Sequence, residues 1–247
     1  MDFTWLQPEF SPTGVVLGLA LLAYLVVFEP LLGMRSFGYL RRYRSQDPRA
    51  LPRVYRRTLA VEAGWLVVVA LILVVSPDLD PGAVGLSVPS GSLLAGAVGF
   101  TAFAVVAQVV VGLVFRHRGA TVAAAGDYAY LLPVTPAERR LAGLVAVSAG
   151  VGEEVVVRGL LIALGVGAAG LPPLTAAVAS TALFGFLHLY QGWSGVLYTT
   201  LLGAVLAGLY LATSSLLLPI LLHVTVNTRA LLITTYSGLP TERPPAP

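Results

Sequence analysis

Residues 141–165 read LAGLVAVSAGVGEEVVVRGLLIALG, a largely apolar run that contains Glu153, Glu154 and Arg158. A helix needs roughly 20 mostly apolar residues to cross the hydrocarbon core of a bilayer, so this stretch is long enough to span a membrane. An ionisable side chain inside such a helix costs free energy unless it is paired or hydrated. The stretch therefore predicts a membrane-spanning helix in which three ionisable groups have a specific role.

Six other runs resemble it in length and hydrophobicity, and Pro, Gly or charged residues separate them. The seven runs are 14–34, 59–75, 93–115, 141–165, 174–190, 194–212 and 216–236. They predict an all-α fold, a polytopic membrane helix bundle that forms a single transmembrane domain over residues 1–247. We expect seven transmembrane helices, or eight if residues 120–133 insert partly. The Pro-rich tail, 237–247, is expected to be disordered.

The composition excludes a soluble domain. Hydrophobic residues make up 57% of the chain and charged residues 11%, against about 25% charged residues in soluble proteins. Cysteine is absent, which excludes disulfides, thiolate metal sites and a cysteine nucleophile. Eight of the Arg residues lie in 35–57, between two apolar runs. This is not the pattern of a nucleic-acid-binding face. We expect membrane lipids as partners and no nucleic acid.

The Arg residues also predict an orientation, because short cytoplasmic loops collect basic residues. Segments 35–57 and 116–140 are basic, whereas segment 76–92 carries Asp78 and Asp80 and no basic residue. With seven crossings, this predicts a multi-pass protein of the cell membrane with its N-terminus outside and its C-terminus in the cytoplasm.

The spacing of the polar residues in the last helices predicts shared faces, because residues four apart lie on one side of a helix. Glu154 and Arg158 are expected to form an ion pair, while Glu153 points about 100° away and lacks that partner. His223 and Asn227 share a face, and Phe184 is expected to set its ring below His188. Distances along the helices at about 1.5 Å per residue permit a shared cavity in the middle to cytoplasmic half of the membrane.

Other polar residues are expected to be structural. Glu29, followed by Pro30, is placed near the end of the first helix, and Glu62 at the start of the second, where a carboxylate favours the helix dipole. For the main cluster a structural network that organises the helices is the alternative. The chain has three His and one Asn, and two of the His and this Asn fall in the cluster, which favours a functional site.

Three motifs resemble those of a known family, the CAAX-processing and bacteriocin-processing (CPBP, or Abi) membrane proteases, which include the type II CAAX prenyl endopeptidases. Glu153-Glu154-Val-Val-Val-Arg158 is similar to the EExxxR motif, Phe184-Gly-Phe-Leu-His188 to FxxxH, and His223-Val-Thr-Val-Asn227 to HxxxN. Each motif alone is weak, but three in order inside apolar helices are specific. The resemblance covers a catalytic core at 131–232 and leaves the N-terminal helices undiagnosed.

The resemblance implies proteolysis within the membrane. Glu153 and His188 would activate a water, and His223 and Asn227 would stabilise the oxyanion. Glu154, Arg158 and Phe184 would support the site. Family members are often described as metalloproteases, and Glu153, His188 and His223 are a conceivable zinc set. Because the chain has no HExxH motif, a glutamate mechanism without a cofactor is favoured, with zinc as the alternative.

The expected substrate is a membrane-associated or lipidated peptide or protein. Two other functions stay open at this point. One is a non-catalytic membrane scaffold or bacteriocin self-immunity protein that keeps the cluster as a helix-organising network. The other is a proton-coupled transporter in which Glu153 and the two His residues relay protons, although the sequence has no internal repeat of the kind that many transporters show.

Overall fold

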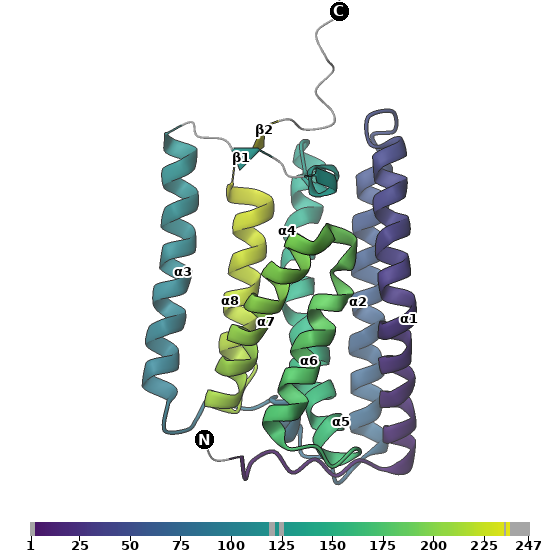
Figure 1. Ribbon diagram of the computed structural model, residues 1–247, viewed down its shortest axis with the longest axis vertical. Coiled ribbons are helices and arrows are strands. Elements are labelled where there is room, and N and C mark those ends of the chain that lie inside the picture. The colour runs from purple at the N-terminus through teal and green to yellow at the C-terminus, as the bar shows by residue number, and fades with distance from the viewer. Residues whose placement is uncertain (1–2, 119–121, 124–125, 235, 238–247) are drawn as a thin grey trace, which may run out of the picture.

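The computed structural model describes residues 3–118, 122–123, 126–234 and 236–237, and within them the chain is a bundle of helices that run along one common axis (Figure 1). The α-helices are α1 Pro12–Tyr43, α2 Ala50–Val75, α3 Leu94–His117, α4 Pro136–Glu153, α5 Leu161–Gly167, α6 Pro173–Leu187, α7 Gly192–Thr213 and α8 Leu217–Thr228. Two π-helices, Glu154–Leu160 and Arg229–Ile233, continue α4 and α8. The predicted all-α class is confirmed.

Short elements connect the helices. The 3-10 turns are η1 Pro81–Val84, η2 Gly126–Leu131 and η4 Leu189–Gln191. Two-residue strands, β1 Val122–Ala123 and β2 Tyr236–Ser237, pair in parallel. Residues 126–131, part of the segment considered for an eighth span, form η2, and the Tyr55 hydroxyl of α2 donates a hydrogen bond to the Leu131 carbonyl. Beyond Ser237 the expected tail lies outside the described residues.

The seven predicted apolar runs each correspond to a helical segment, but not every segment is long enough to span a membrane by itself. Among the described residues, four helices are long and apolar enough to cross, namely α1, α2, α3 and the segment Leu189–Thr213. The runs Pro173–Leu187 and Leu217–Ile233 are shorter, and the continuous helix 136–167 carries the charges of the site. These helices therefore support a membrane helix bundle, whereas the number of seven crossings stays a prediction.

The first two helices are longer than the sequence predicts. Helix α1 continues nine residues past the expected end at Met34, and α2 begins at Ala50 instead of residue 59. Both extensions contain several Arg residues, which end the apolar pattern but have a high helix propensity. Hydropathy thus located the apolar part of each helix, while the helix itself extends beyond it.

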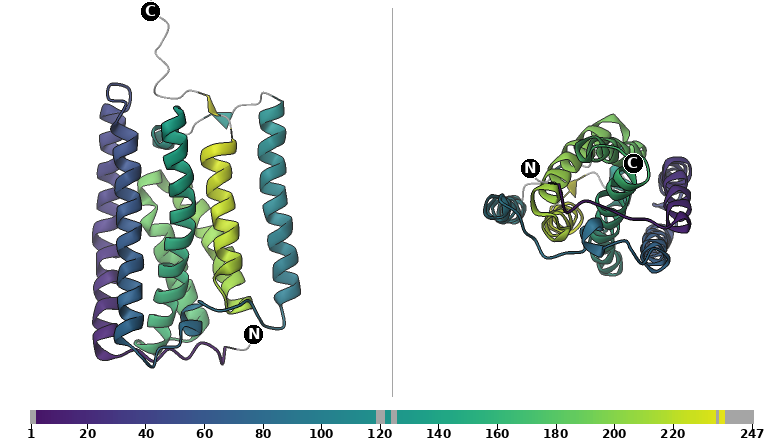
Figure 2. Two further views of the ribbon diagram at one scale, coloured as in Figure 1. Left: turned by 180° about the vertical axis from the view of Figure 1, so that it is seen from behind. Right: turned by 90° about the horizontal axis from the view of Figure 1, so that it is seen from below.

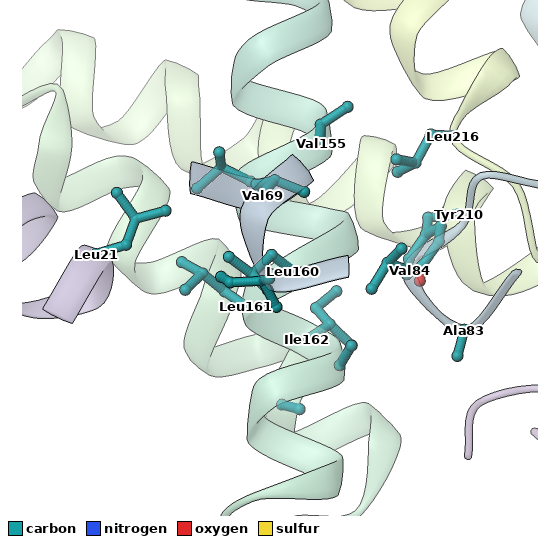
Figure 3. Close-up of a cluster of buried hydrophobic side chains, with 14 of the residues drawn as sticks. Leu21, Val69, Ala83, Val84, Val155, Leu160, Leu161, Ile162, Tyr210 and Leu216 are labelled. Atoms are coloured by element: carbon teal, nitrogen blue, oxygen red, sulfur yellow. The ribbon is translucent and has the colours of Figure 1, made fainter. Parts of the chain in front are cut away.

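The helix made of α4, the π-helix and α5 lies at the centre of the bundle. Every residue of the π-helix Glu154–Leu160 is buried, the pattern of a helix that is surrounded on all sides. Figure 3 shows Val155, Leu160, Leu161 and Ile162 of this helix among side chains from α1, α2, η1 and α7. This packing holds the helix that carries the EExxxR sequence.

The other helices surround this centre unevenly (Figure 2). Helices α1 and α2 form a pair on one side, and α3 lies at the opposite side, where it packs mainly on α8 and the π-helix after it. Exposed apolar side chains such as Phe100 and Phe103 cover α3. Such a surface suits contact with lipid.

A buried ion pair joins the end of α1 to the start of α4. Arg44 donates to both carboxylate oxygens of Glu138, at 2.8 and 2.9 Å, and Glu138 also closes a capping box with Thr135. Burial raises the pKa of Glu138, but the backbone N–H groups of Thr135 and Val134 and the Arg44 guanidinium outweigh it and hold that pKa below its usual value. This clamp lies just before the apolar part of α4 and sets the start of the central helix.

Candidate active site

Glu154 is the centre of the buried polar cluster. Its Oε1 accepts hydrogen bonds from Arg158 Nη1 at 2.9 Å and from His223 Nδ1 at 2.7 Å. The side chains of Glu154 and Arg158 have no exposed surface, so each charge needs the other. The predicted Glu154–Arg158 ion pair is confirmed, and the contact with His223 adds a link from the central helix to α8.

Glu153 has different surroundings from its neighbour. Its side chain is 18% exposed, and Oε2 lies 3.7 Å from His223 Nε2. That oxygen has no hydrogen-bond partner among the described residues. As expected from the helical angle, Glu153 does not share the Arg158 pairing of Glu154. His223 thus stands between two carboxylates, with one ring nitrogen directed to each.

Phe184 connects the two histidines. Its ring centroid lies 4.7 Å from that of His188 and 5.9 Å from that of His223, and the Arg158 guanidinium lies over its face at 4.1 Å. Its carbonyl oxygen is 2.8 Å from His188 Nδ1. A carbonyl only accepts, so His188 Nδ1 carries the hydrogen, and Nε2 is left as an acceptor when the ring is neutral.

The chain turn after α6 sets the depth of His188. The sequence predicts a helix through residue 190, but α6 ends at Leu187 and His188 caps it before η4. In Figure 1 the hairpin of α6 and α7 turns below the upper ends of α1 and α4. The turn therefore lies partway along the bundle axis, and His188 reaches the other polar residues from the end of a helix.

The four proposed catalytic side chains line one cavity. Glu153, His188, His223 and Asn227 contribute to its wall together with residues of α1, α2 and η2, and its volume is about 210 Å³. The expectation of a shared cavity is therefore met. Much of the wall comes from the N-terminal helices, which the motifs do not cover, so α1 and α2 complete the site.

The polar residues of this cavity that sequence reasoning did not assign to the site include Glu29, Glu62 and Tyr190. The prediction that Glu62 begins a helix was wrong, because α2 starts at Ala50 and Glu62 lies in its middle, 3% exposed. Glu29 is likewise inside α1, where it accepts a hydrogen bond from Tyr24 at 3.4 Å. The sequence did contain a signal for both glutamates, because a carboxyl group inside a membrane helix costs free energy unless it has a specific role.

The π-helical segments are a second feature that spacing did not predict. In the π-helix Glu154–Leu160 the N–H of Leu161 bonds to the carbonyl of Val156, five residues back, and Thr234 bonds to Arg229 in the same way. The first segment begins at Glu154 and the second follows Asn227 by two residues. π-Helical turns are rare and occur frequently at functional sites.

The three residues considered as zinc ligands, Glu153, His188 and His223, do not have the geometry of a metal site. Among the described residues, no three His, Asp or Glu side chains are grouped closely enough to hold a metal ion. We therefore derive no step through a metal.

The fold and site define a class, a membrane helix bundle with a Glu–His–His–Asn cavity behind a buried Glu–Arg pair. Residues 138–229 match the family model described as type II CAAX prenyl endopeptidase Rce1-like. This segment contains all three motifs, and the match supports a CPBP/CAAX protease family, which implies a protease. No curated protein and no solved structure matches the chain.

Proposed function

We propose that this protein is an intramembrane endopeptidase that hydrolyses a peptide bond of a membrane-associated or lipidated peptide. The observation that supports it best is the cavity in which Glu153, His188, His223 and Asn227 meet. It combines a carboxylate without a hydrogen-bond partner, an imidazole acceptor and an amide donor. These are the groups needed to activate water and to stabilise an oxyanion.

In the proposed reaction, Glu153 and His188 Nε2 hold a water molecule in the cavity. The water oxygen forms a bond to the substrate carbonyl carbon, one water proton passes to Glu153, and the carbonyl electron pair moves onto oxygen. When the intermediate collapses, the C–N bond breaks and the leaving nitrogen takes the proton from Glu153. The products are a carboxylic acid and an amine, and Glu153 returns to its starting state.

His223 and Asn227 are proposed to stabilise the oxyanion. Because His223 Nδ1 bonds to Glu154, a donor at Nε2 requires an imidazolium ring. Glu154 supports that cation directly at 2.7 Å. With Arg158 and a charged His223, the two cations balance Glu153 and Glu154, so a protonated His223 leaves the cluster without net charge. Asn227, one turn further along α8, adds a neutral N–H donor.

The cavity also supports the proposed kind of substrate. Its wall combines the polar site with apolar side chains such as Leu32, Phe37 and Trp65, and it lies toward the end of the bundle that carries most Arg residues. An amphiphilic peptide presents both kinds of surface. The distribution of Arg further supports a cytoplasmic position for this end, because basic residues collect on the cytoplasmic side.

The test is the hydrolysis of an internally quenched peptide that ends in a prenylated CAAX sequence, with purified protein in liposomes. Glu153→Gln should lower kcat at least about a hundredfold, because a general base contributes that much or more, and should leave the melting temperature close to that of wild type. A zinc chelator is included in the assay, and the wild-type protein should stay active in its presence. Cleavage that survives Glu153→Gln would exclude the proposed mechanism.

The same preparation separates the two rival functions. A scaffold or self-immunity protein would cleave no peptide and would keep its cellular phenotype in Glu153→Gln. A proton-coupled transporter would give substrate-dependent flux in the liposomes without any peptide product.

A further inference from the structure

Glu62 is a buried carboxyl group that the proposed reaction does not use. It projects from the middle of α2 into the cavity, and 3% of its surface is exposed. Its Oε2 atom has no hydrogen-bond partner among the described residues, while Ser148 of α4 lies within hydrogen-bonding reach of the carboxyl group. An unsatisfied buried oxygen is costly, so a second interaction across the cavity is expected.

The backbone of the central helix brings this group next to Glu153. A Cβ atom built on Gly152 would lie 3.6 Å from Glu62 Cβ and 3.9 Å from its Cγ. Gly152 therefore lets α2 approach α4 with the stem of Glu62 against the residue that precedes Glu153. Both carboxyl groups then extend into the same cavity, and each has a buried Oε2 atom without a hydrogen-bond partner among the described residues.

Neighbouring carboxyl groups in one low-dielectric cavity cannot all be ionised cheaply, and Glu62 and Glu153 lower their energy when one of them keeps a proton. The contacts distinguish the two groups. Glu153 lies 3.7 Å from His223, whose cationic form favours a carboxylate. Glu62 packs on Gly152 and Ser148, which are neutral. Glu62 is therefore the member of the pair that is suited to act as a hydrogen-bond donor.

We propose that Glu62 is a positioning residue whose protonated carboxyl group donates a hydrogen bond to Glu153, directly or through one water, and orients it toward the substrate. The proposal rests on the proposed function of Glu153. It gives the N-terminal helices a part in the reaction, because α2 then contributes the group that holds the base supplied by α4.

The experiment compares Glu62→Leu with Glu62→Gln in the liposome assay with the quenched prenylated peptide. Glu62→Leu removes the donor and should lower kcat about a hundredfold, the effect of a misplaced catalytic group, with KM changed by less than about threefold. Glu62→Gln keeps an N–H donor and should retain most of the activity. An unchanged kcat in Glu62→Leu, or an equal loss in Glu62→Gln, would overturn the proposal.

Glu29 is the matched control, because it is a carboxyl group that lines the same cavity from α1. Glu29→Leu and Glu29→Gln make the same side-chain changes without touching the Gly152 contact. If the Glu62 variants act through position, each Glu29 variant should lower kcat less than the matching Glu62 variant does. An equal loss in Glu29→Leu would point to a general charge effect and would contradict the proposal.

A second measurement does not depend on catalysis. The melting temperatures of Glu62→Leu, Glu153→Leu and the double variant form a cycle, and interacting side chains give changes that do not add. Additive changes would overturn the proposed contact at any level of activity. Non-additive changes together with a wild-type protein that cleaves no peptide would refute the protease function and still establish the contact.

Discussion

Glu153 and Glu154 are adjacent in sequence, yet their surroundings divide them between two roles. Glu154 is completely buried and bonds to Arg158 and His223, whereas Glu153 is partly exposed to the cavity. The helical angle between neighbouring residues separates them, since one turns inward to the ion pair and the other toward the cavity. Glu154 also bonds to His223 Nδ1, so it supports the proposed oxyanion donor as well as the central helix.

At this scale we predict that breaking the buried pair unfolds the protein more readily than removing Glu153. Glu154→Gln leaves Arg158 buried without its carboxylate and should cost about 3–5 kcal/mol in the free energy of unfolding. Thermal or denaturant unfolding in detergent measures the change.

The control is the ion pair of Arg53 and Asp47, which has a similar N–O distance, 2.6 Å, but lies at the surface. Asp47→Asn should cost no more than about 1 kcal/mol. Equal losses in the free energy of unfolding would show that the buried Glu154–Arg158 pair contributes no more to stability than a surface ion pair.

At the scale of elements, the site depends on how closely α8 approaches α4. A Cβ atom built on Gly150 would lie 2.9 Å from the backbone N and 3.1 Å from the Cα of Val224, which follows His223. Backbone atoms cannot give way as a side-chain tip can. Gly150 therefore sets the spacing at which His223 reaches both Glu153 and Glu154.

We predict that Gly150→Ala pushes α8 away from α4. The overpacking should destabilise the protein by about 1–3 kcal/mol, and the displaced His223 should lower kcat more than it changes KM. Peptide cleavage and thermal unfolding test the two effects.

Gly143 offers a matched control on the same helix. A Cβ there would meet only Leu232 Cδ1, at the ordinary distance of 3.6 Å, so Gly143→Ala should leave both quantities unchanged. A Gly150→Ala protein that behaves like Gly143→Ala would contradict the proposed spacing role.

At the scale of the whole molecule, the two ends of the bundle differ in charge. Helix α1 begins at the end of the bundle where α8 also begins, and the segments rich in Arg lie at the other end (Figure 1). The cavity opens among residues of the Arg-rich half. If this half faces the cytoplasm, the substrate bond reaches the site from the cytoplasmic side.

Because the chain lacks cysteine, single cysteines can test this orientation. Asp78 and Ser45 are both exposed, the first between α2 and η1 and the second between α1 and α2. Asp78→Cys should react with a membrane-impermeant maleimide in intact cells, and Ser45→Cys only after the membrane is opened. The reverse pattern would place the cavity at the outer side.

The sequence alone determined the features that depend on local helix geometry. Composition and run length predicted the apolar helices, and spacing of four predicted the contacts of Glu154 with Arg158 and of Phe184 with His188. These contacts follow from the 3.6-residue turn, which needs no information on neighbouring helices. The sequence did not predict the long extensions of α1 and α2, because the apolar pattern ends where the Arg residues begin, although each helix continues.

The tertiary structure alone decided the contacts between helices. The bond of His223 to Glu154 joins residues 69 positions apart, and the burial of Glu62 depends on a glycine of another helix. Such contacts follow from how closely and at what angle the helices pack, which no single-helix pattern contains. For the same reason the short α6, whose end carries His188 into the interior, became evident only in the assembled bundle.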